Sequence, residues 1–161
     1  MRRITTILAT LVVLGLSACA QNGVFDNPDG GADVQFGDPG SVTFFQTSVG
    51  DRVLFPVDQS TLTPDAQAIL AAQAAWLAEN PGYTAVIEGH ADEQGTREYN
   101  LALGARRANS ARDYLVSRGI PASALKTVTF GKERPIAICS EEACYSQNRR
   151  AVTVLQAGGG L

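Results

Sequence analysis

The chain has 161 residues, 45% of them hydrophobic, and its 13 basic and 16 acidic side chains give a formal net charge of −3. This length fits one domain with accessory segments, and the apolar share is sufficient for a hydrophobic core. The acidic balance, without a run of Lys or Arg, argues against nucleic acid as a partner.

Residues 1–18 are typical of a bacterial signal peptide rather than of a folded element. Arg2 and Arg3 form a short positive start. Ile7 to Leu16 is an apolar stretch, shorter than the ~20 residues of a membrane-spanning helix. Without Arg2 and Arg3 the basic count falls from 13 to 11, and against 16 acidic residues the net charge becomes −5.

The segment ends in Leu16-Ser17-Ala18-Cys19, which resembles the lipid-attachment signal of bacterial lipoproteins. The Cys19 thiol can form a thioether to a diacylglycerol, and cleavage would make Cys19 the acylated first residue. Two or three acyl chains suffice for stable anchoring in a membrane. Ala20 follows, and the absence of Asp there favours the outer membrane over the inner membrane. An ordinary secretory signal with an incidental cysteine is the alternative.

Residues 19–41 predict a lipidated N-terminus and a flexible tether, because Asp, Gly, Pro and Asn dominate them. Such a segment buries too little apolar surface to offset the entropy of ordering it. The run Gly158-Gly159-Gly160 predicts a disordered tail over residues 158–161. The folded domain is therefore expected over residues 42–157.

Within this domain a strand is expected over Arg52 to Val57, followed by a helix. Thr63-Pro64-Asp65 combines an N-cap hydroxyl, a proline at the first helical position and an acid in the first turn. The helix is expected to end at Glu79, before Asn80-Pro81-Gly82. Its predicted buried face consists of Ile69, Leu70, Trp76 and Leu77.

A second strand is expected over Tyr83 to Gly89, and a longer helix from Gly95-Thr96 to Arg118, with Gly119 after its end. The predicted core stripe of that helix is Leu101, Ala105, Ala108 and Leu115. Two further strands are expected over Lys126 to Phe130 and Arg149 to Gln156. Strands interleaved with helices predict an α/β fold of two layers, with two main helices packed on one sheet.

Polar side chains concentrate around the start of the longer helix. Asn100, Leu103 and Arg107 share one helix face, and Asp92 lies in the loop before it. The helix N-terminus itself favours anions. A carboxylate, an amide and a guanidinium together can hold a zwitterion. The alternative is a solvated helix with an Asp–Arg surface pair of little energetic weight.

Five motifs between Arg52 and Leu155 resemble the OmpA-like peptidoglycan-binding domain. They are Glu88-Gly89-His90-Ala91-Asp92-Glu93-Gln94-Gly95-Thr96, Glu98-Tyr99-Asn100, Leu103-Gly104 with Arg106-Arg107-Ala108-Asn109, Phe130-Gly131-Lys132-Glu133-Arg134-Pro135, and Tyr145-Ser146-Gln147-Asn148-Arg149-Arg150-Ala151-Val152. The lipid signal and the tether are similar to those of the lipoprotein members of this family, the peptidoglycan-associated lipoproteins (Pal) of the Tol–Pal system. The resemblance implies a mixed sheet of about four strands.

In this family one Asp and one Arg clamp the diaminopimelate residue of the peptidoglycan stem peptide, and they match Asp92 and Arg107. The resemblance implies that Asp92 takes the ammonium group of diaminopimelate. Arg107 would take the carboxylate through two parallel hydrogen bonds, which a Lys cannot supply. Further pocket residues implied by the resemblance are Asn100, Leu103, Val57 and Asp58.

Cys139 and Cys144 remain once Cys19 is acylated. In an oxidising periplasm an even pair predicts a disulfide, with two free thiols as the alternative. A zinc site would require these cysteines, a carboxylate and His90, the sole histidine. A catalytic triad would require a Ser in a nucleophile elbow, and the sequence has none. We expect His90 to be a polar residue at a strand end near the pocket, and expect no metal or cofactor.

The resulting expectation is a binding protein and not an enzyme. It would tether the outer membrane to peptidoglycan and support envelope integrity and outer-membrane constriction in cell division. TolB, bound through an overlapping surface, is the expected protein partner. The alternatives are a periplasmic wall-processing hydrolase, or an OmpA-like wall-anchoring protein outside the Tol–Pal system.

Overall fold

The computed structural model describes residues 38–158, so the predicted signal peptide, Cys19, most of the tether and the last residues of the tail lie outside the described range. The elements in chain order are α1 (Val42–Phe44), the π-helical turn η1 (Phe45–Gly50), β1 (Arg52–Leu54), α2 (Pro64–Glu79), β2 (Tyr83–His90), α3 (Arg97–Ser117), the 3₁₀ turn η2 (Ala122–Ala124), β3 (Leu125–Gly131), α4 (Glu142–Asn148) and β4 (Arg150–Ala157). The sheet has the strand order β1-β4-β2-β3. β2 and β3 are parallel, and β4 is antiparallel to β1 and β2, which confirms the predicted mixed sheet.

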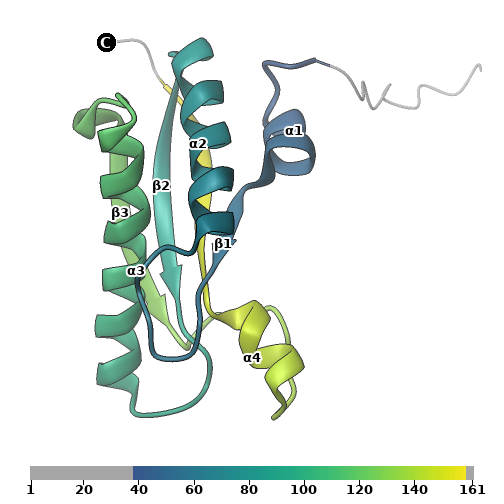
Figure 1. Cartoon of the computed structure of the whole chain (residues 1–161), viewed down its shortest axis with the longest axis vertical. Helices are drawn as coiled ribbons and strands as arrows, with labels where there is room; N and C mark the ends of the chain where they lie inside the picture. The colour runs from purple at the N-terminus through teal and green to yellow at the C-terminus, as the bar shows by residue number, and fades with distance from the viewer. Residues whose placement is uncertain (1–37, 159–161) are drawn as a thin grey trace, which may run out of the picture. The chain divides into compact units, whose positions relative to one another are not determined.

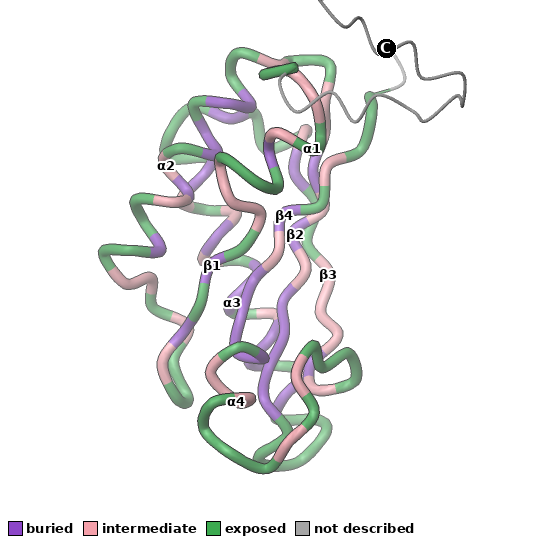
Figure 2. The backbone as a smooth tube through the Cα atoms, turned by 90° about the vertical axis from the view of Figure 1, so that its right-hand side faces the viewer, coloured by how far each residue is buried: buried purple, intermediate pink, exposed green. Residues whose placement is uncertain are grey.

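Helices α2 and α3 lie side by side on one face of the sheet, which gives two layers (Figure 1). Successive strand residues point to opposite faces. Ala85 and Ile87 of β2 and Ala151 of β4 face the helices and are buried. The buried residues follow β2 and α3 through the interior (Figure 2). The predicted architecture of two main helices on one sheet is confirmed.

Helix α2 forms where the sequence predicted it. The Thr63 hydroxyl accepts a hydrogen bond from the Ala66 amide at 3.1 Å, and Pro64 occupies the first turn. Its buried face consists of Ala66, Leu70, Gln73, Ala74, Trp76 and Leu77. Ile69, which was predicted in the core, is only partly buried because it lines an open groove.

Helix α3 approaches the sheet more closely than its pattern predicted. A Cβ placed on Gly89 of β2 would lie 1.8 Å from the carbonyl oxygen of Gly104, so the two glycines allow backbone contact. The face turned inward consists of Asn100, Leu103, Gly104, Arg107, Ala108, Ala111 and Leu115. Leu101 and Ala105, predicted in the core stripe, are only partly buried.

The first predicted strand is shorter in the structure, and one helix was not predicted. β1 ends at Leu54 instead of Val57, because Pro56 has no N–H for strand pairing and begins a turn in which its carbonyl accepts from Gln59 N–H. Helix α4 occupies the segment that the sequence left between the last two strands. It is a single short element without a repeating apolar face, so periodicity did not reveal it.

The folded part begins earlier than residue 42. The Trp76 indole donates a hydrogen bond to the carbonyl of Pro39 at 2.7 Å, and the Tyr83 hydroxyl donates to the carbonyl of Gly40 at 3.2 Å. At the other end, the Gly158 amide donates to the carbonyl of Gly82 at 2.7 Å. The predicted tether and tail therefore each contribute residues to the packed domain.

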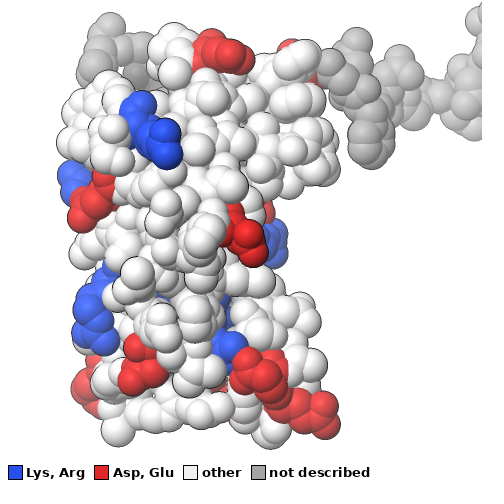
Figure 3. Space-filling view, viewed as in Figure 1, with Lys and Arg blue, Asp and Glu red and all other residues white. Residues whose placement is uncertain are grey.

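The surface that Figure 3 draws carries both signs of charge. Acidic and basic side chains are interspersed over it, with several of each toward the end that bears α4. Over residues 38–158, none of the helices has the length and apolar character needed to cross a membrane.

Candidate ligand-binding site

A small cavity, about 230 Å³ in volume, opens where β2 ends and α3 begins. The loop after β1 forms its opposite wall. Its lining residues are Val57, Asp58, Asp92, Gln94, Gly95, Tyr99, Asn100 and Leu103. We call this cavity the pocket. Five of the six residues assigned to peptidoglycan from the sequence thus line one cavity, and the sixth, Arg107, lies outside its lining.

The turn into α3 fixes one wall of the pocket. Gly95 has a φ of +89°, a conformation that side chains with a Cβ rarely adopt. Thr96 then caps the helix by accepting a hydrogen bond from the Tyr99 amide at 3.2 Å. One residue further, Asn100 Nδ2 donates to the carbonyl of Gln94 at 2.7 Å, which ties the helix to the loop.

The oxygen of this side-chain amide has no partner. Asn100 is 1% exposed, and its Oδ1 accepts no hydrogen bond from any residue between 38 and 158. A buried acceptor left unsatisfied carries a free-energy cost of about 1–3 kcal/mol.

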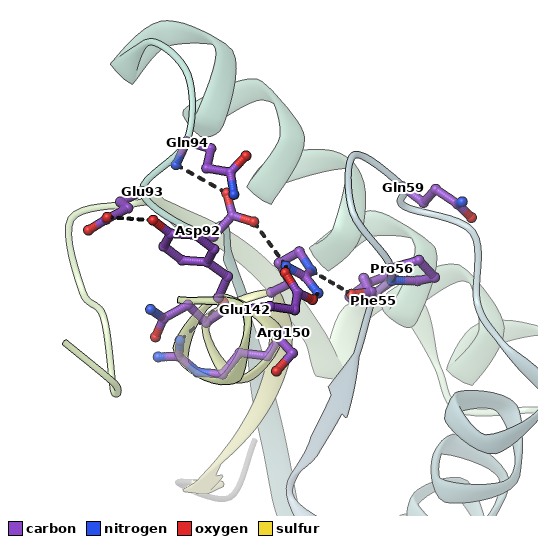
Figure 4. A network of polar contacts seen from close by, with 12 residues as sticks. Phe55, Pro56, Gln59, Asp92, Glu93, Gln94, Glu142 and Arg150 are labelled. Atoms are coloured by element: carbon purple, nitrogen blue, oxygen red, sulfur yellow. Dashed lines mark hydrogen bonds and ion pairs between the residues drawn. The ribbon is translucent and has the colours of Figure 1, made fainter. Parts of the chain in front are cut away.

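Asp92 is a buried carboxylate whose two oxygens have different partners. Oδ1 accepts from the Gln94 amide at 3.2 Å (Figure 4). Oδ2 forms an ion pair with Arg149 Nη1, also at 3.2 Å. Arg149 was not among the predicted site residues, although it lies in one of the quoted motifs. The sequence predicted it at the start of the last strand, which gave no signal that it would reach Asp92; in the structure it lies between α4 and β4.

Arg107 lies beneath the pocket and is fully buried. Nε donates to the carbonyl of Gln59 at 2.8 Å, Nη1 to that of His90 at 2.9 Å, and Nη2 to that of Pro56 at 3.2 Å. A guanidinium has five N–H groups, so one remains on each Nη nitrogen. The alternative of a solvated Asp–Arg surface pair is wrong, because Arg107 has no exposed surface and is not in an ion pair with Asp92.

The charge of Arg107 is only partly compensated. Burial lowers its pKa to about 10, while the nearby carboxylates of Asp92 and Asp58 act in the opposite direction. Over the described range, no carboxylate lies within ion-pair distance of this guanidinium. The Arg107 guanidinium is therefore a buried positive charge near the pocket, outside its lining residues.

The loop after β1 contributes Asp58, whose φ is +56°, the left-handed region that Asp tolerates better than most residues. Its Oδ1 accepts a hydrogen bond from the Tyr99 hydroxyl. Tyr99 is 42% exposed and was not predicted as a site residue. Asp58 and Tyr99 close the pocket between the loop and α3.

Helix α4 stands next to the loop that carries Asp92. Glu93 Oε1 accepts hydrogen bonds from Ser140 Oγ at 3.1 Å and Tyr145 OH at 2.9 Å. Cys139 and Cys144 are joined in a disulfide with a Cα–Cα distance of 5.7 Å. Closing this short loop contributes about 2 kcal/mol by the chain-entropy relation. The disulfide closes the turn before α4 onto the helix, and the Glu93 contacts tie this turn and α4 to the loop that carries Asp92.

His90 lies at the end of β2, on the sheet face away from the helices. Its ring is 2% exposed and stacks on Phe130 with 5.5 Å between centroids. Neither ring nitrogen has a hydrogen-bond partner between residues 38 and 158. Burial and the nearby Arg150 and Arg134 lower its pKa to about 4. Its contribution to the site is the backbone carbonyl that accepts from Arg107.

The residues that could hold a metal do not assemble within the described range. There, no cluster of three or more His, Cys, Asp and Glu side chains is placed for ligation. The sulfurs of Cys139 and Cys144 are bonded to each other, so they are not available beside His90. A larger groove of about 560 Å³ lies between β1 and α2, on the other side of the Phe55-Pro56 turn from the pocket.

The pocket combines three kinds of group that a zwitterionic ligand requires. The carboxylates of Asp92 and Asp58 offer acceptors for an ammonium group. The Arg107 guanidinium beneath them attracts a carboxylate. Val57 and Leu103 add apolar surface for the carbon chain between the two charges.

Comparisons with known proteins agree with this architecture. Residues 54–149 match the OmpA family. The chain is 51% identical over 154 residues to the peptidoglycan-associated lipoprotein of Rhizobium meliloti, covering 94% of this chain and 88% of that protein. It is 47% identical over 167 residues to the peptidoglycan-associated lipoprotein of Brucella melitensis, covering 99% of both.

Solved structures give the same result for the fold. The crystal structure of the peptidoglycan-associated lipoprotein from Burkholderia pseudomallei matches with a TM-score of 0.68 and 37% identity, over 74% of this chain and 100% of that chain. The C-terminal domain of MotB from Helicobacter pylori, at 17% identity, matches with a TM-score of 0.63 over 68% of this chain and 86% of that chain. The second similarity concerns the fold alone.

Proposed function

Because the chain belongs to the OmpA family, we propose that it binds peptidoglycan non-covalently and holds the outer membrane to the cell wall. The near full-length similarity to two peptidoglycan-associated lipoproteins supports this function. We further propose that the protein acts by binding and not by catalysis, since the pocket groups form a cradle of fixed charges without a nucleophile–base pair.

The ligand group that we propose is the diaminopimelate residue of the stem peptide. Its free end carries an ammonium and a carboxylate on one carbon. The ammonium would bind Asp92, with Asp58 as a further acceptor. The carboxylate would bind the two remaining N–H groups of Arg107. The observation that carries this proposal is a fully buried guanidinium that has no carboxylate within ion-pair distance in the described range and lies near the pocket carboxylates Asp92 and Asp58.

The proposal extends to the cellular setting. Acylation of Cys19 would anchor the chain in the outer membrane, and residues 20–37 would span the distance to the wall. TolB would bind a surface that overlaps the pocket, so TolB and the stem peptide would exclude one another. Through these contacts the protein would support envelope integrity and outer-membrane constriction in cell division.

The test is co-sedimentation with purified peptidoglycan. Asp92→Asn should weaken binding about ten- to a hundredfold, because it removes a charge-assisted contact worth roughly 1.5–3 kcal/mol. Asp113→Asn is the matched control, because this substitution makes the same change in net charge. Asp113 lies on α3, and its side chain is 69% exposed. Equal sedimentation of Asp92→Asn and wild type, with both folded, would exclude Asp92 from the binding site.

A further inference from the structure

The guanidinium that holds Asp92 is held in turn by a second carboxylate, Glu142 on α4. Arg149 Nη1 lies 3.2 Å from Glu142 Oε2, and Arg149 Nη2 bonds to Glu142 Oε1. Arg149 Nε donates to the carbonyl of Phe55 at 3.1 Å. The labelled Asp92 and Glu142 side chains come close together from different elements, the loop after β2 and the helix α4 (Figure 4).

The two carboxylates share Arg149 unequally. Glu142 uses both of its oxygens on both Nη nitrogens, whereas Asp92 offers one oxygen to one of them. The pKa of Arg149 is raised, and the hydrogen bonding that it donates to Glu142 is the largest cause. The same contact lowers the pKa of Glu142. Glu142 is therefore the main counter-ion of Arg149.

The charge balance at the pocket follows from this sharing. Two carboxylates and one guanidinium leave a net charge of −1 in the group formed by Asp92, Arg149 and Glu142. Asp92 is 10% exposed and lines the pocket, whereas the Glu142 side chain is 64% exposed and is not among the lining residues. The excess negative charge is therefore available on the pocket side, at Asp92.

We propose that Glu142 is a positioning residue for ligand binding: by occupying Arg149, it keeps the Asp92 carboxylate available for the ammonium group of the ligand. This inference rests on the proposed function of the pocket. Without Glu142, both Nη nitrogens of Arg149 could turn to Asp92 in a two-bond pair. Asp92 and Arg149 would then form a neutral pair, and an ammonium ligand would have to displace the guanidinium.

The chain provides a matched pair of variants for a test. Glu142→Gln removes the charge and keeps the size of the side chain. Glu141→Gln makes the same charge change one residue earlier, at an exposed side chain that makes no capping hydrogen bond. The full-length chain in detergent would be titrated with a soluble stem peptide that contains diaminopimelate. Glu142→Gln should weaken binding about three- to tenfold, and Glu141→Gln less than about twofold.

A double-mutant cycle separates positioning from a general structural role. In an Asp92→Asn background the competition for Arg149 is absent, so adding Glu142→Gln should change the affinity less than about twofold. Millimolar peptide and NMR shifts keep weak binding measurable. If Glu142→Gln weakens binding by the same factor in both backgrounds, the positioning role is wrong and Glu142 is only structural.

The remaining outcomes separate the role of Glu142 from the proposed function of the pocket. If Asp92→Asn weakens binding but Glu142→Gln behaves like Glu141→Gln, the inference about Glu142 is overturned and the proposed function stands. If Asp92→Asn leaves the affinity unchanged, the proposed site is wrong and the inference is overturned with it.

Discussion

Arg107, Arg149 and Arg150 are all buried, and each donates to at least one backbone carbonyl. Buried charge is costly unless it is compensated by hydrogen bonds or counter-ions. Here the guanidinium of Arg107 donates hydrogen bonds to backbone carbonyls, whereas that of Arg149 also pairs with two carboxylates. Arg150 Nε has no hydrogen-bond partner within the described range. The guanidinium of Arg107 has no carboxylate within ion-pair distance in the described range, and such an uncompensated buried charge is typical of a binding site.

His90 gives a prediction about pH, because it is the sole histidine of the chain. Its pKa is about 4 in the folded state, against about 6.5 in an unfolded chain. Between these values only the unfolded state binds the proton, so stability falls as the pH is lowered. Unfolding by denaturant should show a loss of roughly 2 kcal/mol between pH 7 and pH 5.

The control for this prediction is His90→Phe, which keeps an aromatic ring beside Phe130 and removes the titrating group. Its stability should be nearly constant over the same range. Carboxylates such as Glu142, whose pKa is lowered, change the stability at lower pH, because their protonation destabilises the folded state. A similar loss between pH 7 and pH 5 in the variant would show that His90 is not its source.

At the level of elements, the site depends on how closely α3 lies against β2. The helix carries Asn100 and Arg107 on the same inward face as Gly104. A Cβ on Gly104 would lie 2.5 Å from Thr129 Oγ1 and 2.9 Å from the carbonyl oxygen of Gly89. The small residues at this crossing therefore bring polar side chains of the helix within reach of the loops around the pocket.

Gly104→Ala should destabilise the domain despite the better helix propensity of Ala. Propensity favours Ala by about 1 kcal/mol, but the Cβ would clash with the Thr129 hydroxyl of β3 and with the β2 backbone at Gly89, and overpacking of this kind costs about 1–3 kcal/mol or more. Chemical denaturation measures the difference. Gly82→Ala is the control, because a Cβ there meets nothing within 4 Å. Equal stability of Gly104→Ala and wild type would contradict the close packing of α3 on β2.

For the whole molecule, the pattern of strands and helices was predictable, because caps and turn residues mark it locally. Thr63-Pro64 and Thr96 begin α2 and α3 as predicted. The environment of Arg107 was not predictable, since its three carbonyl partners come from two distant segments of the chain, the loop after β1 and the end of β2.

The sequence pattern also did not predict that α4 contributes to the site. Arg149 reaches Asp92 across 57 positions in the chain, and this contact depends on β4 and β2 being neighbours in the sheet. The motifs identified Asp92 and its neighbours through family resemblance. The balance of charge around Asp92 depends on the strand order, which brings Arg149 and Glu142 to it.

The central claim is that the pocket binds the zwitterionic end of diaminopimelate. The most direct measurement is a calorimetric titration of the full-length chain in detergent with two stem peptides. They differ only in carrying diaminopimelate or lysine, which lacks the terminal carboxylate. We expect the diaminopimelate peptide to bind at least about tenfold more tightly, because only it can pair with Arg107 as well as Asp92. Equal affinities for the two peptides would contradict the account.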